Sequence, residues 1–407
     1  RCRTSPPIFC WCCDVGCRAT APERPRRGGA PAGSALGAGA PPVAPPAAPP
    51  PRNRRGGERR RQKLVTCVGL FGSFGNSRAS LLCEEARSQN LRDLHPATEP
   101  LETGFLKTAD GKHELYYEVS GNPAGKPAIF LHGGPGDGCS PKHKRLFDPN
   151  AYRIITFDQR GAGKSRPCGS IDDNTTAHLV EDIELLRRHL NVDSWGLVAG
   201  GSWGSTLALA YAQAHPAMVR GLALYSVFLP SRRSIDWLYL PGGAGDFYPE
   251  AYEKFLSHLP VAERASPVEA YYTRLRSSDS ALCLPARAAL GSWVLTCLAL
   301  TPDPEWIAMV CSKPEEMGDG SLIEMHYMAN KAFLDEGQLL RDCDRIGHIP
   351  CAIVHGQNDM ICPPIGAWLL HKALPLSTLA FAAESGHSSG SAPKLRAVIV
   401  EMIDGFR

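Results

Sequence analysis

Three residues far apart in the sequence have the side-chain types of a nucleophilic hydrolase. Ser202 is the centre of a Gly-Gly-Ser-Trp-Gly motif, and Asp359 and His387 each follow a short apolar run. A serine hydroxyl is a weak nucleophile until an imidazole removes its proton, and a carboxylate fixes the tautomer of that imidazole and stabilises its cation. We therefore expect Ser202 to be the nucleophile, His387 the base and Asp359 the residue that orients the base.

The glycines around Ser202 indicate how the serine is positioned. The motif follows the apolar run Trp195–Ala199 and precedes a helical pattern that is expected to begin at Ser205 and end before Pro216. Between a strand and a helix, a Gly-x-Ser-x-Gly motif forms a sharp turn that exposes the serine hydroxyl, and its glycines allow neighbouring backbone to pass close by. The context predicts a nucleophile elbow.

An acyl-transfer site also needs hydrogen-bond donors where the oxyanion develops. The backbone N–H of Trp203 is one candidate. Gly133 and Gly134 offer the second, because they lie in a glycine-rich loop directly after the apolar run Pro127–Leu131. The sequence thus predicts an oxyanion hole between this loop and the elbow.

The elements that must position these residues form an alternating pattern from Thr103 onward. Seven nearly apolar runs separated by helical periods such as Thr176–Leu190 predict an α/β fold with a mostly parallel sheet covered by helices on both faces. The expected strands are Glu114–Val119, Pro127–Leu131, Tyr152–Phe157, Trp195–Ala199, Gly221–Val227, Cys351–Val354 and Thr378–Ala383, and Pro393–Phe406 is expected to be an amphipathic C-terminal segment.

A segment rich in Trp and Tyr, 230–345, interrupts this alternation and is expected to be a helical cap over the carboxyl ends of the strands. The hydrolase core then consists of residues 101–229 and 346–407. Residues 1–65 are rich in Arg, Pro and Ala and are expected to be a disordered leader, followed by a linker over 66–100.

Charge and hydropathy argue against two classes of partner. Residues 1–65 have a net charge of +10, whereas the remainder of the chain has −7, so the folded body lacks the basic surface of a nucleic-acid binder. The longest apolar run, around Leu290–Leu300, is shorter than the ~20 residues that span a bilayer. We expect neither nucleic acid nor a membrane as partner.

The 15 cysteines have irregular spacings that fit neither a zinc site nor a disulfide framework. We expect free thiols, a reducing compartment, and no metal or other cofactor. The predicted location is the cytoplasm, or an organelle if residues 1–88, which are basic and contain Ser and Ala, act as a transit peptide.

Three motifs together carry a resemblance to a known family. They are His-Gly-Gly-Pro-Gly at 132–136, Asp-Gln-Arg-Gly-Ala-Gly-Lys-Ser at 158–165, and Gly-Gly-Ser-Trp-Gly-Ser-Thr-Leu-Ala-Leu-Ala-Tyr at 200–211. With them, the chain from about Pro100 to its end resembles the proline iminopeptidases. The resemblance implies an α/β-hydrolase fold and a metal-free serine aminopeptidase that removes N-terminal proline from short peptides, with Ser202, Asp359 and His387 matching the family triad.

The resemblance also implies substrate contacts. Glu324 matches a family glutamate that binds the substrate amine, and Phe228, Trp237 and Tyr239 are expected to line the substrate site. A second amine-binding glutamate of the family is replaced here by Val294. Two alternatives to a prolyl aminopeptidase therefore stay open: a carboxylesterase or amidase of broader specificity, and a ligand-binding protein with slow turnover. The sequence predicts no oligomeric state.

Overall fold

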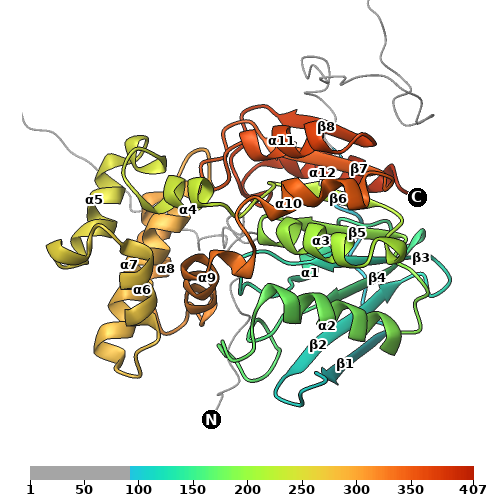
Figure 1. Ribbon diagram of the computed structural model, residues 1–407, viewed down its shortest axis with the longest axis horizontal. Coiled ribbons are helices and arrows are strands. Elements are labelled where there is room, and N and C mark those ends of the chain that lie inside the picture. Colours follow the sequence, from blue (N-terminus) through green and yellow to red (C-terminus); the bar gives the residue numbers. More distant parts are fainter. Residues whose placement is uncertain (1–91) are drawn as a thin grey trace, which may run out of the picture. The chain divides into compact units, whose positions relative to one another are not determined.

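An eight-stranded sheet forms the body of the protein, as seen in a computed structural model that describes residues 92–407 (Figure 1). The strand order is β1-β2-β4-β3-β5-β6-β7-β8, and only the pairs β1–β2 and β2–β4 are antiparallel. The strands are β1 (Glu102–Lys107), β2 (Glu114–Gly121), β3 (Lys126–Leu131), β4 (Tyr152–Phe157), β5 (Leu197–Gly201), β6 (Leu222–Tyr225), β7 (Cys351–Gly356) and β8 (Ser377–Ala382). The predicted leader and the predicted linker up to residue 91 lie outside the described residues.

All seven expected strands are present, with ends shifted by at most two residues. β5 begins two residues late because Trp195 forms only an isolated bridge with Val219. β1 was not expected from the sequence. It is an edge strand with no fully buried residue, so it lacks the apolar signal of the central strands.

Helices cover both faces of the sheet, and alternate residues of each strand pack beneath them. In β3, Ile129 and Leu131 join one buried cluster, while Ala128 and Phe130 join the other. The first cluster includes residues of α2 (Thr176–His189), α3 (Trp203–Ala214), α10 (Gln338–Arg341) and α11 (Ile365–Ala373), and the second includes α12 (Pro393–Asp404) and the segment after α1 (Pro141–Lys144). The expected α/β layering is confirmed.

A helical segment is inserted between β6 and β7 and lies to one side of the sheet (Figure 1). Besides α10, which packs beside α3 and α11, its helices are α4 (Arg232–Tyr239), α5 (Pro249–Ser257), α6 (Pro267–Leu275), α7 (Ser280–Leu298), α8 (Pro304–Cys311) and α9 (Gly320–Ala329). Its aromatic residues pack on one another: the Phe255 and Tyr271 rings stack at 4.7 Å, and Tyr252 and Trp293 lie 5.2 Å apart. The aromatic residues of this cap thus pack on one another, within the same buried cluster that underlies α2 and α3.

Helix α7 corrects one expectation. With 19 residues it is long and apolar enough, by length and composition, to cross a membrane, so the apolar segment is longer than the sequence analysis recognised. More than half of it is buried, including Arg287, and it contacts α5, α6 and α8. We interpret α7 as the core helix of the cap.

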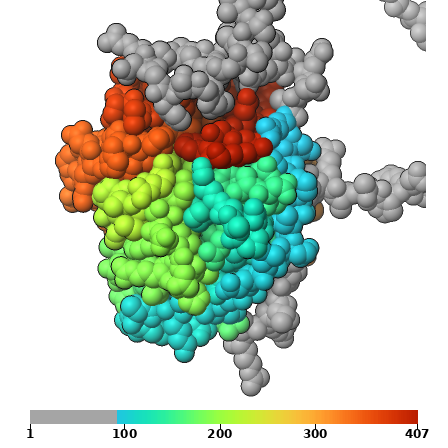
Figure 2. Space-filling model, turned by 90° about the vertical axis from the view of Figure 1, so that its right-hand side faces the viewer, coloured from blue at the N-terminus to red at the C-terminus, as the bar shows by residue number. Residues whose placement is uncertain are grey.

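The two ends of the described chain meet on the side remote from the cap. His95 Nε2 lies 3.0 Å from Asp404 Oδ1, and Tyr152 on β4 donates a hydrogen bond of 2.7 Å to the Ile403 carbonyl. Figure 2 shows the C-terminal helix beside the blue N-terminal segments on this face. These contacts tie the C-terminal end of α12 to β4 and to the segment before β1, while the helix itself packs on β6, β7 and β8.

Candidate functional site

Ser202 stands at the turn between β5 and α3 in a strained backbone conformation, with φ 54° and ψ −127°. Two glycines make this turn possible. A Cβ on Gly200 would lie 2.4 Å from the carbonyl oxygen of Gly204, and a Cβ on Gly204 would lie 2.0 Å from that of Leu131. The predicted elbow is present, although α3 begins at Trp203 rather than at Ser205, because the turn leads directly into the helix.

Asp359 and His387 are brought together at the carboxyl ends of β7 and β8. His387 Nδ1 lies 2.8 Å from Asp359 Oδ2, while Asp359 Oδ1 accepts backbone N–H bonds from Ile361 and Cys362 at 3.0 and 2.8 Å. A second imidazole, that of His355, is 3.3 Å from the same carboxylate. Burial would raise the pKa of Asp359, but the two histidines hold it well below its usual range. Asp359 is therefore an anion that can stabilise an imidazolium.

Cys362 connects the serine to this acid–base pair. Burial and the charge of Asp359 raise the pKa of the Cys362 thiol well above its ordinary value. A hydrogen bond with the Ser202 hydroxyl lowers this pKa, but by less than the other two effects raise it. Ser202 N also donates to the Tyr225 carbonyl at 3.1 Å, and the neighbouring Ser226 hydroxyl donates to the His387 carbonyl at 2.9 Å. Among residues 92–407 no hydrogen bond joins Ser202 to His387, a bond that often tightens only when substrate is bound.

The loop after β3 lies beside the elbow. Trp203 Nε1 donates to Gln159 Oε1 at 2.9 Å, and Gln159 Nε2 donates to the carbonyl of His132 at 3.0 Å. The wholly buried His132 contacts the carbonyl of Gly133 through Nδ1 at 2.9 Å, and burial lowers its pKa to about 3. The imidazole is therefore neutral and acts as a spacer that fixes the loop of Gly133 and Gly134 next to the first turn of α3.

Glu324 and Tyr239 meet inside the cap. The Tyr239 hydroxyl donates to Glu324 Oε1 at 2.6 Å. Burial, aided by the charge of Asp137, outweighs this bond and raises the pKa of Glu324 to about 7. Val294 is buried on α7, one residue after Trp293, whose Nε1 donates to the Leu238 carbonyl at 3.0 Å. The carboxylate thus lies in a shielded environment suited to a substrate cation.

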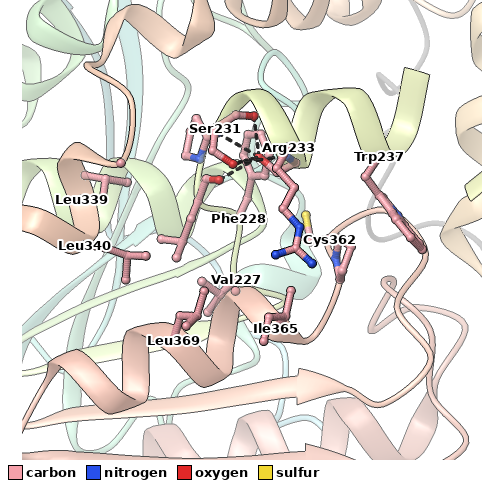
Figure 3. Close-up of a pocket in the computed structure, with 16 residues that line it drawn as sticks. Val227, Phe228, Ser231, Arg233, Trp237, Leu339, Leu340, Cys362, Ile365 and Leu369 are labelled. Atoms are coloured by element: carbon pink, nitrogen blue, oxygen red, sulfur yellow. Dashed lines mark hydrogen bonds between the residues drawn. The ribbon is translucent and has the colours of Figure 1, made fainter. Parts of the chain in front are cut away.

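Phe228 and Trp237 line a separate apolar cavity of about 160 Å³ (Figure 3). The cavity lies at the carboxyl ends of β6 and β7, and Cys362 forms part of its wall. Trp237 Nε1 donates to the Met360 carbonyl at 2.9 Å, next to Asp359. The four expected substrate residues therefore divide into two places: Glu324 with Tyr239, and Phe228 with Trp237.

Sequence reasoning assigned no role to three residues of this region. Gln159 supports the loop and the elbow, His355 contacts the acid, and Cys362 contacts the serine. The available signal was position, because all three follow or end buried strands that lead to the site. Within the described chain no group of three or more His, Cys, Asp or Glu residues is arranged to hold a metal ion.

Comparison with known proteins identifies relatives of this arrangement. The family described as alpha/beta hydrolase fold matches residues 126–390. A probable proline iminopeptidase of Leptolyngbya boryana is 47% identical over 76% of this chain and 95% of its own length. The proline iminopeptidase of Arabidopsis thaliana is 45% identical over 76% of this chain and 81% of its own, and that of Xanthomonas citri is 44% identical over 78% and 100%.

Solved structures share the fold at low sequence identity. A bromoperoxidase from Bacillus anthracis has a TM-score of 0.53 at 18% identity, covering 74% of this chain and 100% of its own. A thermophilic esterase from Thermogutta terrifontis has a TM-score of 0.52 at 19% identity, covering 74% and 97%. These likenesses support the α/β-hydrolase architecture and no particular substrate.

Proposed function

The chain belongs to the proline iminopeptidase family of α/β hydrolases, and we propose that it releases N-terminal proline from short peptides through an acyl-enzyme on Ser202. The observation that carries this proposal is the occurrence of the strained Ser202, the His387–Asp359 pair and the partly buried Glu324 in one hydrolase fold. The names of its relatives support the same reaction.

The first half of the reaction forms the ester. Ser202 Oγ attacks the carbonyl carbon of the N-terminal proline while His387 takes the hydroxyl proton at Nε2, and Asp359 holds Nδ1 at 2.8 Å. The backbone N–H of Trp203, together with that of Gly133 or Gly134, stabilises the oxyanion. His387 then gives the proton to the leaving nitrogen, and the shortened peptide departs.

The second half restores the enzyme. Water gives a proton to His387 and attacks the ester, and the returning proton re-forms the Ser202 hydroxyl as proline leaves. Glu324 binds the charged amine of the substrate, so the ester forms at the end of a peptide rather than within it. No step requires a metal ion.

The test is hydrolysis by the full chain of a prolyl anilide, its N-blocked analogue, an alanyl anilide and a short p-nitrophenyl ester. We expect preference for the unblocked prolyl compound, and the Ser202→Ala variant as control should lose that activity. Equal rates on blocked and unblocked prolyl compounds would contradict the aminopeptidase assignment.

A broader amidase or esterase is the second candidate, and one observation favours it. The position where the family has a second glutamate is the buried Val294, so the amine is bound with less negative charge than in the family. Activity on the ester alone would support this candidate.

The cytoplasm stays the proposed location.

A further inference from the structure

The cavity in Figure 3 combines an apolar lining with a cation. Its walls come from the segment after β6, from α4, from the region of α10, and from the segment that leads into α11. Arg233 lies on its edge, and its side chain extends from α4 toward Cys362 and Ile365 (Figure 3). Among the described residues no carboxylate forms an ion pair with Arg233, whereas the adjacent Arg232 pairs with Asp236 at 3.5 Å and does not line the cavity.

The cavity adjoins the proposed nucleophile. Cys362 lies in its wall and contacts the Ser202 hydroxyl, and its backbone N–H donates to Asp359 at 2.8 Å. The segment 227–230 also lines the cavity and lies shortly after Tyr225, whose carbonyl accepts a hydrogen bond from Ser202 N. A group that leaves Ser202 toward Cys362 would therefore enter this cavity.

Helix α4 connects the edge of the cavity to the contact with Glu324. Arg233 is near its first residue, and Tyr239, which binds Glu324, is its last. Six residues of α-helix rise about 9 Å along the axis, which is close to the length of two to three extended peptide residues at about 3.3–3.6 Å each. The Ser231–Ser234 capping box fixes the start of the helix and hence the backbone of Arg233.

We propose that this cavity binds the part of the substrate that follows proline, with an apolar side chain against its walls and the peptide's C-terminal carboxylate on the Arg233 guanidinium. The substrates favoured by this arrangement are prolyl dipeptides and tripeptides with a free C-terminus. Their positive amine matches Glu324, and their negative carboxylate matches Arg233. The inference rests on the proposed prolyl aminopeptidase function and specifies its substrate class.

The apolar walls also favour a particular side chain in the residue that follows proline. Leu340, Ile365 and Leu369 line the cavity, and Ile365 and Leu369 are each 42% exposed. Covering them with a leucine side chain removes apolar surface from water, which a serine side chain cannot do. A leucine after proline should therefore be preferred to a serine.

The experiment compares Pro-Leu-Gly as free acid with its C-terminal amide, using the full chain, with prolyl anilide as a substrate that has no carboxylate. The unmodified protein should have about tenfold higher kcat/KM on the acid, as expected for a charge-assisted hydrogen bond. Arg233→Met keeps the apolar stem and should raise KM for the acid about tenfold, with kcat unchanged. The amide and the anilide should stay within about twofold.

Arg232→Met is the matched control and should alter none of the three substrates. Equal kcat/KM on acid and amide in the unmodified protein would overturn the inference, as would an equal loss on all three substrates in Arg233→Met. A protein that cleaves no prolyl substrate would instead overturn the proposed function. Cleavage of anilide and amide without preference for the acid would overturn only the assignment of Arg233.

Discussion

The carboxyl end of the sheet and the cap position their functional groups in different ways. At the sheet, backbone geometry positions the functional side chains. Ser202 is held by a turn that only glycines permit, and Asp359 is held by two backbone N–H bonds. In the cap, single side-chain contacts position the functional groups, such as the hydrogen bond from Tyr239 to Glu324. The catalytic residues are thus positioned by the backbone, whereas the proposed amine site depends on single side chains such as Glu324.

The largest expected effect tests whether the sheet positions one base or two. His387→Ala should reduce kcat by roughly 10⁶-fold, as loss of the base does in serine peptidases. His355 contacts the same carboxylate but also accepts from Val227 N at 3.0 Å, so it is held as a structural group. His355→Gln should lower the melting temperature and change kcat by less than about tenfold in the folded protein. A larger loss of kcat in His355→Gln than in His387→Ala would contradict this assignment and make His355 the base.

The next largest effect is expected from a change in the backbone of the elbow at Gly204. Gly204→Ala places a methyl group 2.0 Å from the Leu131 carbonyl oxygen, so the elbow or β3 must shift. We expect a loss of at least about 4 kcal/mol in unfolding free energy, and a loss of activity in whatever remains folded. Gly347→Ala is the control, because its nearest neighbours are 3.6 Å away. Chemical denaturation measures both, and comparable stability of the two variants would refute the argument from close approach.

A smaller effect concerns the charge in the cap. Because the pKa of Glu324 is about 7, the carboxylate forms as the pH rises through 7, and kcat/KM for unblocked prolyl substrates should rise with it. Glu324→Gln should remove this rise and reduce kcat/KM about 10- to 100-fold, leaving the N-blocked analogue nearly unchanged. A pH profile that is the same in both proteins would exclude Glu324 from amine binding.

The same shift predicts an effect of opposite sign on stability. The folded protein holds a proton on Glu324 that the unfolded chain releases near pH 4.5, so stability falls as the pH rises from 4.5 through 7. The cost above pH 7 is on the order of 3 kcal/mol. The melting temperature of the unmodified protein should therefore be lower at pH 8 than at pH 5.5 through this group. In the Glu324→Gln variant, the difference between the two melting temperatures should be smaller.

The smallest expected effect would restore charge to the cap. Val294→Glu should raise turnover of unblocked prolyl substrates a few-fold, offset in part by the cost of burying a carboxylate at a site where the valine is 7% exposed. Alanyl anilide and the p-nitrophenyl ester should not gain. An unchanged or lower rate on the prolyl compound would show that position 294 no longer faces the amine.

The same contrast explains how far the sequence could be interpreted. The strands, the elbow and the loop of Gly133 were predictable because apolar period and glycine spacing report backbone geometry directly. The edge strand β1 was not predictable, because it buries too little surface. Nor was the division of the substrate residues, since Tyr239 and Glu324 are 85 positions apart and meet only through the packing of the cap.

The insertion between β6 and β7 also determines the order in which the protein can become active during synthesis. These strands are neighbours in the sheet, yet the whole cap separates Tyr225 from Cys351 in the chain. The pair cannot form until the ribosome has released both, and closing so long a loop is slow. Asp359 and His387 emerge later still, so a nascent chain carries Ser202 without its base.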